Sequence, residues 1–548
     1  MTQPLLKIER LTLALPEGGD RLYAVENVSY ELRAGEILCV VGESGSGKSM
    51  TANAVMGLLP PGIRVAGGRA LFQSDDILRL TPQAHRAIRG RRIGMIFQEP
   101  MTALNPLMRV GAQIAEVFEA HGLLTPLERQ QKALSLLEEV GLPDPQSSLR
   151  AYPFELSGGQ RQRVMIAMAL ALEPELLIAD EPTTALDVTT QAQILQLIHD
   201  IQQRRGMGVM LITHDFGVVA EIADRVCVMR QGRIVEMGPT DDILAHPHHD
   251  YTRALIEAIP GEAVPPSRDE QDHAPLLSVK SLNKVYRSKG GWFKPVREVV
   301  ALNEVSFDVG KGETLGIVGE SGSGKSSLGR CIVGLNTPDS GQMCLEGEDL
   351  QQLSGQALRE HRQRIQMVFQ DPYASLNPRI RIGMAIAQGP IAHGADKAEA
   401  LMQARRLLET VGLDACAADR FPHEFSGGQR QRIGIARALA MNPELIVADE
   451  AVSALDVSIQ AQVLALLEEL KQSLSLSLLF ITHDLRVAAQ ICDRLIVMQK
   501  GRIVEQGPVE QIFLDPQHDY TRKLLEAIPG RQASSPHVMD KALLNTCY

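Results

Sequence analysis

Two glycine-rich octapeptides have the residue types and spacing of a phosphate-binding loop. The sequence Gly-Glu-Ser-Gly-Ser-Gly-Lys-Ser occupies residues 42–49 and recurs at residues 319–326. Glycines let the backbone wrap closely, so that successive N–H groups point at phosphate oxygens, and a helix that begins at the loop adds its N-terminal dipole. The lysine of such a loop contacts the β and γ phosphates, and the final serine ligates Mg²⁺. The residues predicted to bind a nucleoside triphosphate are Gly42, Ser44, Gly45, Gly47, Lys48 and Ser49, and in the second copy Gly319, Ser321, Gly322, Gly324, Lys325 and Ser326.

An aspartate–glutamate pair ends an apolar run at two places, Asp180-Glu181 and Asp449-Glu450. An aspartate at a strand end can hold the shell of a Mg²⁺ ion, directly or through water. The adjacent glutamate can polarise an attacking water as a general base, which contributes about 10²–10⁴ in rate. A single pair of this kind is commonly a solvated strand end. Because both pairs follow a Ser-Gly-Gly-Gln sequence at the same spacing, we interpret them as catalytic and metal-binding carboxylates.

Short apolar runs of strand length must position these groups. Residues 37–42 lead into the first loop, residues 175–181 and 208–215 are further runs, and each has a counterpart in the second half. Alternation of such strands with helical patterns predicts an α/β fold whose mainly parallel sheet is covered on both faces. The stretches 107–150 and 379–420 have helical patterns instead, and we expect each to form a separate helical lobe.

The chain is a duplication. Residues 24–49 recur at 301–326, and residues 154–188 recur at 423–457. Repeats of this size are whole domains rather than units of a solenoid. The predicted organisation is a first domain at 1–261, a proline-rich linker at 262–275, a second domain at 276–530 and an unassigned tail at 531–548.

Composition limits the class of protein. Lys plus Arg is 55 and Asp plus Glu is 66, a formal charge of −11, whereas a protein that wraps nucleic acid needs a basic face. The seven cysteines are scattered without a Cys-x-x-Cys pair, so we expect no disulfide framework, no zinc and no iron–sulfur cluster. No stretch approaches the roughly 18 apolar residues of a spanning helix, and Lys7, Glu9 and Arg10 interrupt any secretion signal. We therefore expect a cytosolic chain.

The order of the motifs is similar to that of the ATP-binding-cassette ATPases. Each half has in turn the phosphate loop, a glutamine (Gln98 or Gln370), Ser-Gly-Gly-Gln, the acidic pair, Ala-Leu-Asp and Thr-His-Asp. The resemblance covers nearly the whole chain. It implies two tandem P-loop NTPase domains of the ABC type, each with a mainly parallel sheet core, a helical lobe and a small antiparallel β part. It also implies that two cassettes meet head to tail, with ATP and Mg²⁺ clasped between the phosphate loop of one and the Ser-Gly-Gly signature of the other.

Carried over residue by residue, the resemblance implies two composite sites. The first combines residues 42–49, Gln98, Asp180, Glu181 and His214 with Ser426, Gly427 and Gly428. The second combines residues 319–326, Gln370, Asp449, Glu450 and His483 with Ser157, Gly158 and Gly159. The implied metal ligands are Ser49, Gln98 and Asp180 in one site and Ser326, Gln370 and Asp449 in the other. A Ser-Gly-Gly turn that opens a helix is a second anion cradle, since no Cβ stands near the phosphate.

The histidines of the Thr-His-Asp sequences complete the predicted catalytic set. His214 and His483 each follow an apparent strand and can donate a hydrogen bond to the γ-phosphate. A lone histidine is more often structural, but recurrence in the same sequence context favours a functional role. Both acidic pairs, with Glu181 and Glu450 as the bases, and both signatures are complete. We therefore predict two hydrolytic sites.

The halves differ where the resemblance implies an aromatic ring that stacks on adenine. Tyr286 holds this position in the second half, and Leu15 holds it in the first. Either Tyr23 substitutes for the missing ring, or apolar contact alone holds adenine there. Stacking of bases on aromatic side chains is worth about 1–3 kcal/mol, so unequal nucleotide affinity is an open alternative.

Two features narrow the subfamily. Residues 179–195 and 448–464 resemble the two distinct ATPase subunits of oligopeptide and dipeptide importers, and residues 246–261 and 515–530 resemble their C-terminal extension. The resemblance implies the ATP-hydrolysing energy-coupling subunit of an inner-membrane importer of peptides or related small solutes, peripheral on the cytoplasmic side. Its implied partners are two separate transmembrane permease subunits and an extracytoplasmic solute-binding protein, without nucleic acid.

Several alternatives remain. An exporter motor fits the motifs, and so does a soluble tandem ATPase that acts on ribosomes or DNA, although the short linker is unlike a long charged helix. The extension either packs a terminal helix or docks a partner. Trp292 lies in an exposed loop or in a lid over Tyr286, and the basic cluster at 86–92 is a solvated face or a phosphate or lipid contact.

Overall fold

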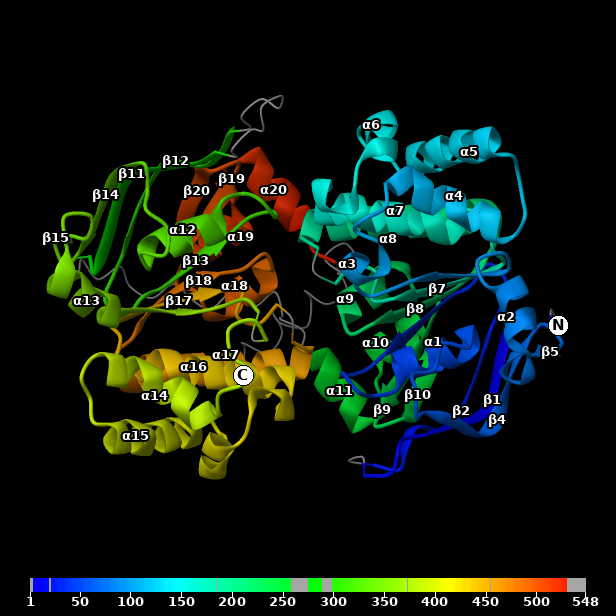
Figure 1. The fold of residues 1–548 in the computed structure, drawn as a ribbon, viewed down its shortest axis with the longest axis horizontal. Helices are drawn as coiled ribbons and strands as arrows, with labels where there is room; N and C mark the ends of the chain where they lie inside the picture. Colours follow the sequence, from blue (N-terminus) through cyan, green and yellow to red (C-terminus); the bar gives the residue numbers. More distant parts are fainter. Residues whose placement is uncertain are drawn as a thin grey trace, which may run out of the picture. The chain divides into compact units, whose positions relative to one another are not determined.

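The computed structural model describes residues 3–18, 21–184, 186–257, 275–287, 298–371, 373–453 and 455–529. These residues form two compact units, one built mainly from residues 3–257 and the other mainly from residues 275–528 (Figure 1). Trp292, the tail at 531–548 and nearly all of the predicted linker lie outside the described residues. Within the described ranges, no helix is long and apolar enough to cross a membrane.

The first unit contains two sheets. An antiparallel sheet has the strand order β2-β1-β4-β5, and a six-stranded sheet has the order β10-β9-β3-β8-β7-β6 and is parallel except for β10. The strands are β1 (Leu6–Ala14), β2 (Tyr23–Leu32), β3 (Ile37–Val41), β4 (Arg64–Phe72), β5 (Asp75–Asp76), β6 (Ile93–Ile96), β7 (Leu176–Asp180), β8 (Gly208–Thr213), β9 (Arg225–Arg230) and β10 (Arg233–Pro239). The predicted strands at 37–42, 175–181 and 208–215 are therefore confirmed as β3, β7 and β8.

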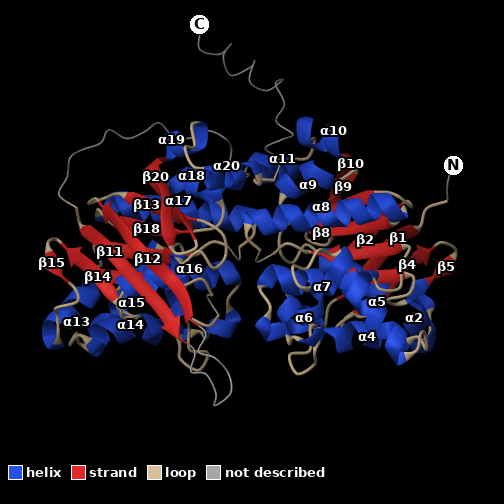
Figure 2. Cartoon of the chain, turned by 90° about the horizontal axis from the view of Figure 1, so that it is seen from above, coloured by secondary structure: helices blue, strands red, loops and turns tan. Residues whose placement is uncertain are grey.

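Helices cover both faces of the six-stranded sheet. They are α1 (Lys48–Met56), α2 (Pro82–Ile88), α3 (Pro100–Ala103), α4 (Val110–Ala120), α5 (Pro126–Glu139), α6 (Pro145–Arg150), α7 (Gly158–Leu170), α8 (Val188–Arg205), α9 (Phe216–Ile222), α10 (Thr240–Ala245) and α11 (Asp250–Glu257), with 3₁₀ turns at Ile77–Arg79 and Pro153–Glu155. Helices α4 to α7 lie together in both views (Figures 1 and 2) and pack on one another. They confirm the predicted helical lobe.

Successive side chains of β3 point to opposite faces of the sheet, and a separate hydrophobic core covers each face. Cys39 and Val41 join the core formed with the helical lobe and α7 to α9, whereas Leu38 and Val40 join the core formed with α1 and the antiparallel sheet. Every residue of β3 is buried, as expected for a central parallel strand. Helices α1 and α7 therefore pack on opposite faces of the same sheet.

The second unit repeats this plan. Its sheets have the orders β12-β11-β14-β15 and β16-β17-β18-β13-β19-β20. Its strands are β11 (Leu277–Arg287), β12 (Glu298–Val309), β13 (Thr314–Val318), β14 (Ser340–Leu345), β15 (Glu348–Asp349), β16 (Ile365–Val368), β17 (Leu445–Asp449), β18 (Ser477–Ile481), β19 (Arg494–Gln499) and β20 (Arg502–Pro508). Its helices are α12 (Lys325–Ile332), α13 (Gly355–Arg364), α14 (Ile382–Ala392), α15 (Lys397–Thr410), α16 (Gly427–Leu439), α17 (Val457–Leu474), α18 (Leu485–Ile491), α19 (Val509–Leu514) and α20 (Asp519–Glu526), with 3₁₀ turns at Ala415–Asp419 and Pro422–Glu424. The predicted α/β class, with a mainly parallel core, a helical lobe and a small antiparallel part, is confirmed in both halves.

Two arginines of the basic cluster at 86–92 have structural partners. Arg89 donates to the carbonyl oxygens of Met56 and Gly57 at the end of α1, at 2.6 and 2.7 Å. Arg92 pairs with Glu175 at 2.7 Å. Both contacts join α1 or β7 to the segment before β6, so these two arginines support the fold.

Candidate nucleotide-binding sites

Each phosphate loop leaves the carboxyl end of a central strand and enters a helix, β3 to α1 and β13 to α12. Gly42 has φ +147°, and a Cβ at this residue would lie 2.1 Å from the carbonyl oxygen of Met229. Gly319 has φ +150°, and its Cβ would lie 2.3 Å from the carbonyl oxygen of Met498. Only glycine fits at the start of either loop, because both the backbone angle and the neighbouring strand exclude a side chain.

The loop lysine is already held inside the curve of each loop. Lys48 Nζ donates to the carbonyl oxygens of Gly42 at 2.6 Å and of Glu43 at 2.9 Å. In the second half Lys325 Nζ donates to Gly319 at 2.7 Å and to the equivalent glutamate at 2.9 Å. Both lysines are buried, and burial lowers the pKa of Lys325. An anionic ligand in the loop would gain a charge that is already desolvated and positioned.

The structure brings the last serine of each loop to the aspartate of the acidic pair. Ser49 Oγ donates to Asp180 Oδ1 at 2.9 Å, and Ser326 Oγ donates to Asp449 Oδ1 at 2.9 Å. Burial raises the pKa of Asp180 to about 6 and also raises that of Asp449. Hydroxyl and carboxylate oxygens are the ligands that Mg²⁺ prefers, and a divalent cation would compensate a buried carboxylate. These residues therefore fit the predicted metal.

The predicted general base of the first half is surrounded by three polar side chains. Glu181 Oε2 accepts from Gln98 Nε2 at 3.0 Å and from Thr184 Oγ1 at 2.9 Å, and His214 Nδ1 lies 3.4 Å from the same oxygen. Burial favours the neutral acid, but the His214 hydrogen bond and charge, with the Thr184 bond, lower the pKa of Glu181 to about 2. Glu181 is thus an ionised carboxylate, the form that can accept a proton from water.

The second half repeats the glutamine and histidine contacts, whereas Ser453, the counterpart of Thr184, donates to the backbone carbonyl of Glu450 at 3.0 Å. Glu450 Oε2 accepts from Gln370 Nε2 at 2.7 Å, and His483 Nδ1 lies 3.4 Å from it. Burial again opposes ionisation, but the contact with His483 lowers the pKa of Glu450. The same contact raises the pKa of His483 against the effect of its own burial. Both glutamates also have φ +46°, a left-handed conformation that is uncommon outside glycine and is typical of functional positions.

The signature residues begin α7 and α16. Ser157 Oγ accepts from Gln160 N at 3.3 Å, while Ser157 N donates to Gln160 Oε1 at 2.9 Å, which is a capping box. Ser426 and Gln429 form the same reciprocal pair at 3.4 and 3.1 Å. Each signature therefore presents the N-terminus of a well-capped helix.

The two glycines of each signature have different reasons to be glycine. A Cβ on Gly159 would lie 2.6 Å from Thr190, and one on Gly428 would lie 2.4 Å from Ile459, so packing within the half requires both. A Cβ on Gly158 or Gly427 would meet its nearest neighbour only at 3.9 or 3.8 Å. Packing inside the half therefore leaves room for a side chain at Gly158 and Gly427. A ligand that approaches the backbone at these two positions would exclude that side chain.

Each unit thus unites its predicted loop, metal ligands, glutamate, glutamine and histidine at one sheet edge. It does not place the signature with them, because α7 packs on the sheet face opposite to α1. The composite arrangement of the two sites remains a prediction.

The adenine-contact position differs between the units. The Tyr286 side chain is 39% exposed, and its hydroxyl accepts from Asn336 Nδ2 at 2.7 Å. Leu15 instead packs against the buried core under the antiparallel sheet. An accessible ring is therefore available only in the second unit at this position.

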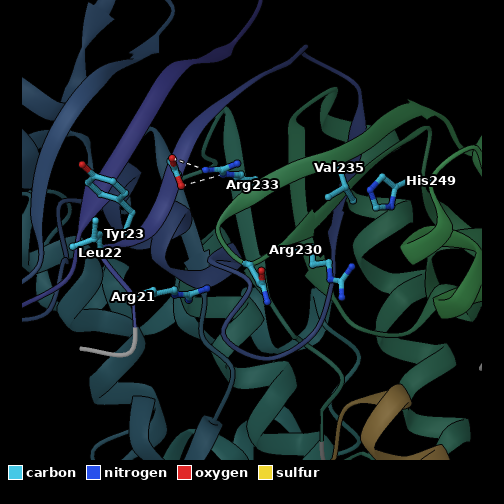
Figure 3. Close-up of a pocket in the computed structure, with 9 residues that line it drawn as sticks. Arg21, Leu22, Tyr23, Arg230, Arg233, Val235 and His249 are labelled. Carbon is cyan, nitrogen blue, oxygen red and sulfur yellow. Dashed lines mark hydrogen bonds and ion pairs between the residues drawn. The ribbon is translucent and has the colours of Figure 1, made fainter. Parts of the chain in front are cut away.

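A basic pocket lies beside the phosphate loop of the first unit (Figure 3), with a volume of about 950 Å³. Arg21 donates to the carbonyl oxygen of Gly45 in the loop, and Arg233 pairs with Glu26 at 2.7 Å. The remaining lining residues are Leu22, Tyr23, Arg230, Gln231, Val235 and His249. Tyr23 thus lines a cavity next to the loop, which is compatible with its suggested contact with adenine.

Sequence reasoning missed a contact of each loop. Tyr251 in α11 and Tyr520 in α20 accept hydrogen bonds from the N–H groups of Glu43 and Glu320, both at 3.1 Å. The signal was present in the repeated His-Asp-Tyr-Thr-Arg sequence at 249–253 and 518–522. Nothing in that sequence shows which side chain turns back to the loop, because the contact spans about two hundred residues of chain.

Comparison with known proteins agrees with this geometry. The family model described as ABC transporter matches residues 25–184 and 302–453, which together exceed half of the chain. The chain therefore belongs to the ABC transporter family and is an ATPase built from two cassettes. A second model, described as the C-terminal region of oligopeptide/dipeptide transporters, matches residues 235–287 and 504–540, so the chain belongs to the branch that carries this region.

Two curated relatives are similar over nearly their whole length. The peptidoglycan transport ATP-binding protein YejF of Agrobacterium fabrum is 47% identical over 96% of this chain and 96% of its own. The glutathione import ATP-binding protein GsiA of Salmonella choleraesuis is 47% identical over 96% of this chain and 90% of its own. Among solved structures, cbiO1 from Clostridium perfringens, part of the ABC transporter complex cbiONQ, aligns with 48% of this chain and 99% of its own at 25% identity and a TM-score of 0.40.

Proposed function

We propose that this chain hydrolyses ATP to drive an inner-membrane importer of peptides or related small solutes. It would act at the cytoplasmic face, with two separate permease subunits and an extracytoplasmic solute-binding protein. The observation that carries the proposal is the transporter-type C-terminal region, which follows a cassette in both halves.

The names of the relatives support an import role for peptide-like solutes. One relative is a glutathione import protein and another a peptidoglycan transport protein, and both solutes contain amide bonds between amino acids. The two relatives are equally similar to this chain, so similarity alone supports the class of solute rather than one solute. The name of the glutathione import protein speaks against an exporter motor, and both names speak against an ATPase that acts on ribosomes or DNA.

The test of this proposal is isolation of the tagged full-length chain from membranes of its own host. We expect two integral membrane proteins to co-purify. We also expect the ATPase rate of the reconstituted complex to rise when a solute-binding protein loaded with a short peptide is added. Co-purification with ribosomal particles, or with neither partner, would contradict the proposal.

We also propose that Mg²⁺ is held in each half by the serine–aspartate pair, Ser49 with Asp180 and Ser326 with Asp449. The amide oxygens of Gln98 and Gln370 complete the proposed oxygen ligands. When bound, the ion would supply charge neutralisation at the β and γ phosphates.

Finally, we propose that each phosphate loop is completed by the signature of the other half. Two observations support this arrangement. The loop helix and the signature helix pack on opposite faces of the sheet in one half, and Gly158 and Gly427 have room for a side chain within their own half.

Crossed double variants test the pairing. Lys48→Ala disables the first loop, and Ser426→Arg blocks the signature assigned to the same site. The variant with both changes should therefore behave like Lys48→Ala alone. Lys48→Ala with Ser157→Arg damages two different sites and should lose nucleotide binding at both. Bound ATP per chain is the readout, because it counts sites even when hydrolysis at the two is coupled. The opposite ranking of the two double variants would show that each half uses its own signature.

A further inference from the structure

One peptide group at the start of the first phosphate loop is held from both sides. The Gly42–Glu43 peptide presents its carbonyl to Lys48 Nζ, which donates to it at 2.6 Å. Its N–H group donates to the hydroxyl oxygen of Tyr251 at 3.1 Å. The lysine that is expected to meet the phosphates and a tyrosine of the C-terminal extension are therefore joined through a single peptide.

The second half contains the same arrangement. The Gly319–Glu320 peptide accepts from Lys325 Nζ at 2.7 Å and donates to Tyr520 at 3.1 Å. Tyr251 and Tyr520 are both 7% exposed. Their surroundings have diverged, since the Arg230 guanidinium lies 4.7 Å above the Tyr251 ring whereas Gln499 ends the equivalent strand β19. The hydroxyl contact is thus common to the two halves although one of the neighbours of the ring is not.

Hydrogen bonds within the C-terminal extension orient the tyrosine in each half. Glu236 on β10 accepts from the N–H groups of His248 and His249 at 2.8 and 3.1 Å, which fixes the chain just before α11. His249 Nδ1 then accepts from Tyr251 N at 3.0 Å. The counterparts in the second half are Glu505, which accepts from Gln517 and His518, and His518 Nδ1, which accepts from Tyr520 N at 3.1 Å. The tyrosine is therefore placed by fixed backbone rather than by a free helix end.

The chemistry of the contact explains what it does to the loop. An acceptor on the N–H and a cation on the carbonyl polarise the same peptide, so each bond strengthens the other. Gly42 and Gly319 have no side chain to restrict rotation of that peptide. Burial raises the pKa of Tyr520 to about 12, so its hydroxyl is neutral and serves as an acceptor for Glu320 N.

We propose that Tyr251 and Tyr520 are positioning residues for ATP binding, and that they couple the C-terminal extension to the phosphate loops. Each hydroxyl fixes the first peptide of its loop and, through the carbonyl of that peptide, the lysine that meets the phosphates. Without the hydroxyl, the peptide is held less firmly, and ATP must complete its ordering on binding. This inference depends on ATP binding by the loops and not on the direction or the solute of transport.

The test uses Tyr251→Phe and Tyr520→Phe in the full-length chain, because phenylalanine keeps the ring and removes the hydroxyl, which in Tyr520 also bonds to the Glu320 side chain. Affinity for MgATP is measured for one half at a time, with the lysine of the other loop replaced by alanine. A lost hydrogen bond of about 1 to 1.4 kcal/mol corresponds to a fivefold to tenfold weaker affinity. We expect KM for ATP to rise by a similar factor while kcat at saturating ATP changes by less than twofold.

The matched control is Tyr30→Phe. Tyr30 is also a buried tyrosine, and its hydroxyl donates to Met210 Sδ at 3.1 Å away from the loop. This variant should lower the melting temperature without changing ATP affinity. If Tyr251→Phe and Tyr520→Phe do the same, the tyrosines only pack the extension and the proposal is wrong.

A second variant keeps the proposal testable if either phenylalanine variant fails to fold. His249→Ala removes the acceptor that orients Tyr251 N and leaves the tyrosine in place. We expect a smaller loss of ATP affinity in the first half, about twofold to threefold for one weakened hydrogen bond. An unchanged affinity in this variant, with the expected fold retained, would contradict the coupling.

Discussion

The two halves agree at the groups predicted to hydrolyse ATP and differ where the nucleotide base is expected. The bond from loop serine to aspartate is 2.9 Å in both halves, and the contact from histidine to glutamate is 3.4 Å in both. In contrast, Tyr286 is matched by Leu15 in the first half, and Arg21 is matched by Glu298 in the second. The contacts of the predicted catalytic and metal-binding residues are duplicated, whereas the surroundings of the loop are not.

This contrast follows from what each region must do. Activation of water and neutralisation of phosphate charge need atoms at fixed distances, because a small displacement lowers the rate steeply. Contacts with the base add affinity through stacking or apolar surface, and several side chains can supply these. A duplicated ATPase can therefore keep two hydrolytic centres while its two nucleotide affinities diverge.

The largest expected effect comes from the predicted bases. Glu181→Gln and Glu450→Gln should each remove most hydrolysis at the site concerned, because an amide cannot accept the proton of water. Loss of a general base costs about 10²–10⁴ in rate. Measured as phosphate release, each single variant should lose at least half of the activity, and the double variant should lose at least about 100-fold.

Retained ATP binding is the control for these substitutions, since glutamine keeps the size of the side chain. Full activity in either single variant would show that one of the two centres is silent. That result would contradict the comparison at the two glutamates, whose contacts with glutamine and histidine are common to both halves.

A middle-sized effect is expected at the adenine position. Tyr286→Leu gives the second half the residue found in the first, and it should weaken ATP binding there by about tenfold, within the 1–3 kcal/mol range of base stacking. Affinity is measured with Lys48→Ala in the same chain, so that only the second loop binds. If apolar contact alone holds adenine in the first half, the variant should approach the affinity of that half, and if Tyr23 supplies a ring there, it should fall below it.

Asn336→Ala is the control for this substitution. It removes the amide that donates to the Tyr286 hydroxyl and leaves the ring in place, so the affinity should change little. If Tyr286→Leu also leaves the affinity unchanged, the ring does not contact the base, and the difference between the halves has no effect on nucleotide binding.

The same comparison shows how far the sequence can lead. Motif order and repetition predicted the fold class and the family, because the same motifs follow one another in the same order along each half. The resemblance implied that Ser49 and Asp180 serve one site although they are 131 residues apart, and the structure brings them together. Ser49 follows β3 and Asp180 ends β7, and these strands are separated in the sheet by β8 alone, so the carboxyl ends of these parallel strands meet at one edge.

Other contacts lay beyond the sequence because they join distant elements through side-chain direction. The contact of Tyr251 with Glu43 links the last helix of the first half to its first loop, and no periodicity encodes it. The bond from Thr184 to Glu181 depends on the direction of both side chains, which residue type alone does not predict. Spacing identifies the reacting groups, whereas the groups that orient them require the fold.

The smallest effect is expected at Arg21, which contacts the phosphate loop of the first half. Arg21→Ala removes the guanidinium that donates to the Gly45 carbonyl, and it should weaken ATP binding in the first half by about twofold to fivefold, as expected for one partly exposed hydrogen bond. The second half has Glu298 at this position, so it cannot form the contact.

Arg233→Ala is the matched control, because Arg233 lines the same pocket but pairs with Glu26, and exposed ion pairs contribute little. Equal losses in both variants would assign the effect to the positive charge of the pocket. A loss confined to Arg21→Ala would assign it to the bond with the loop, and so to a difference in how the two halves hold their phosphates.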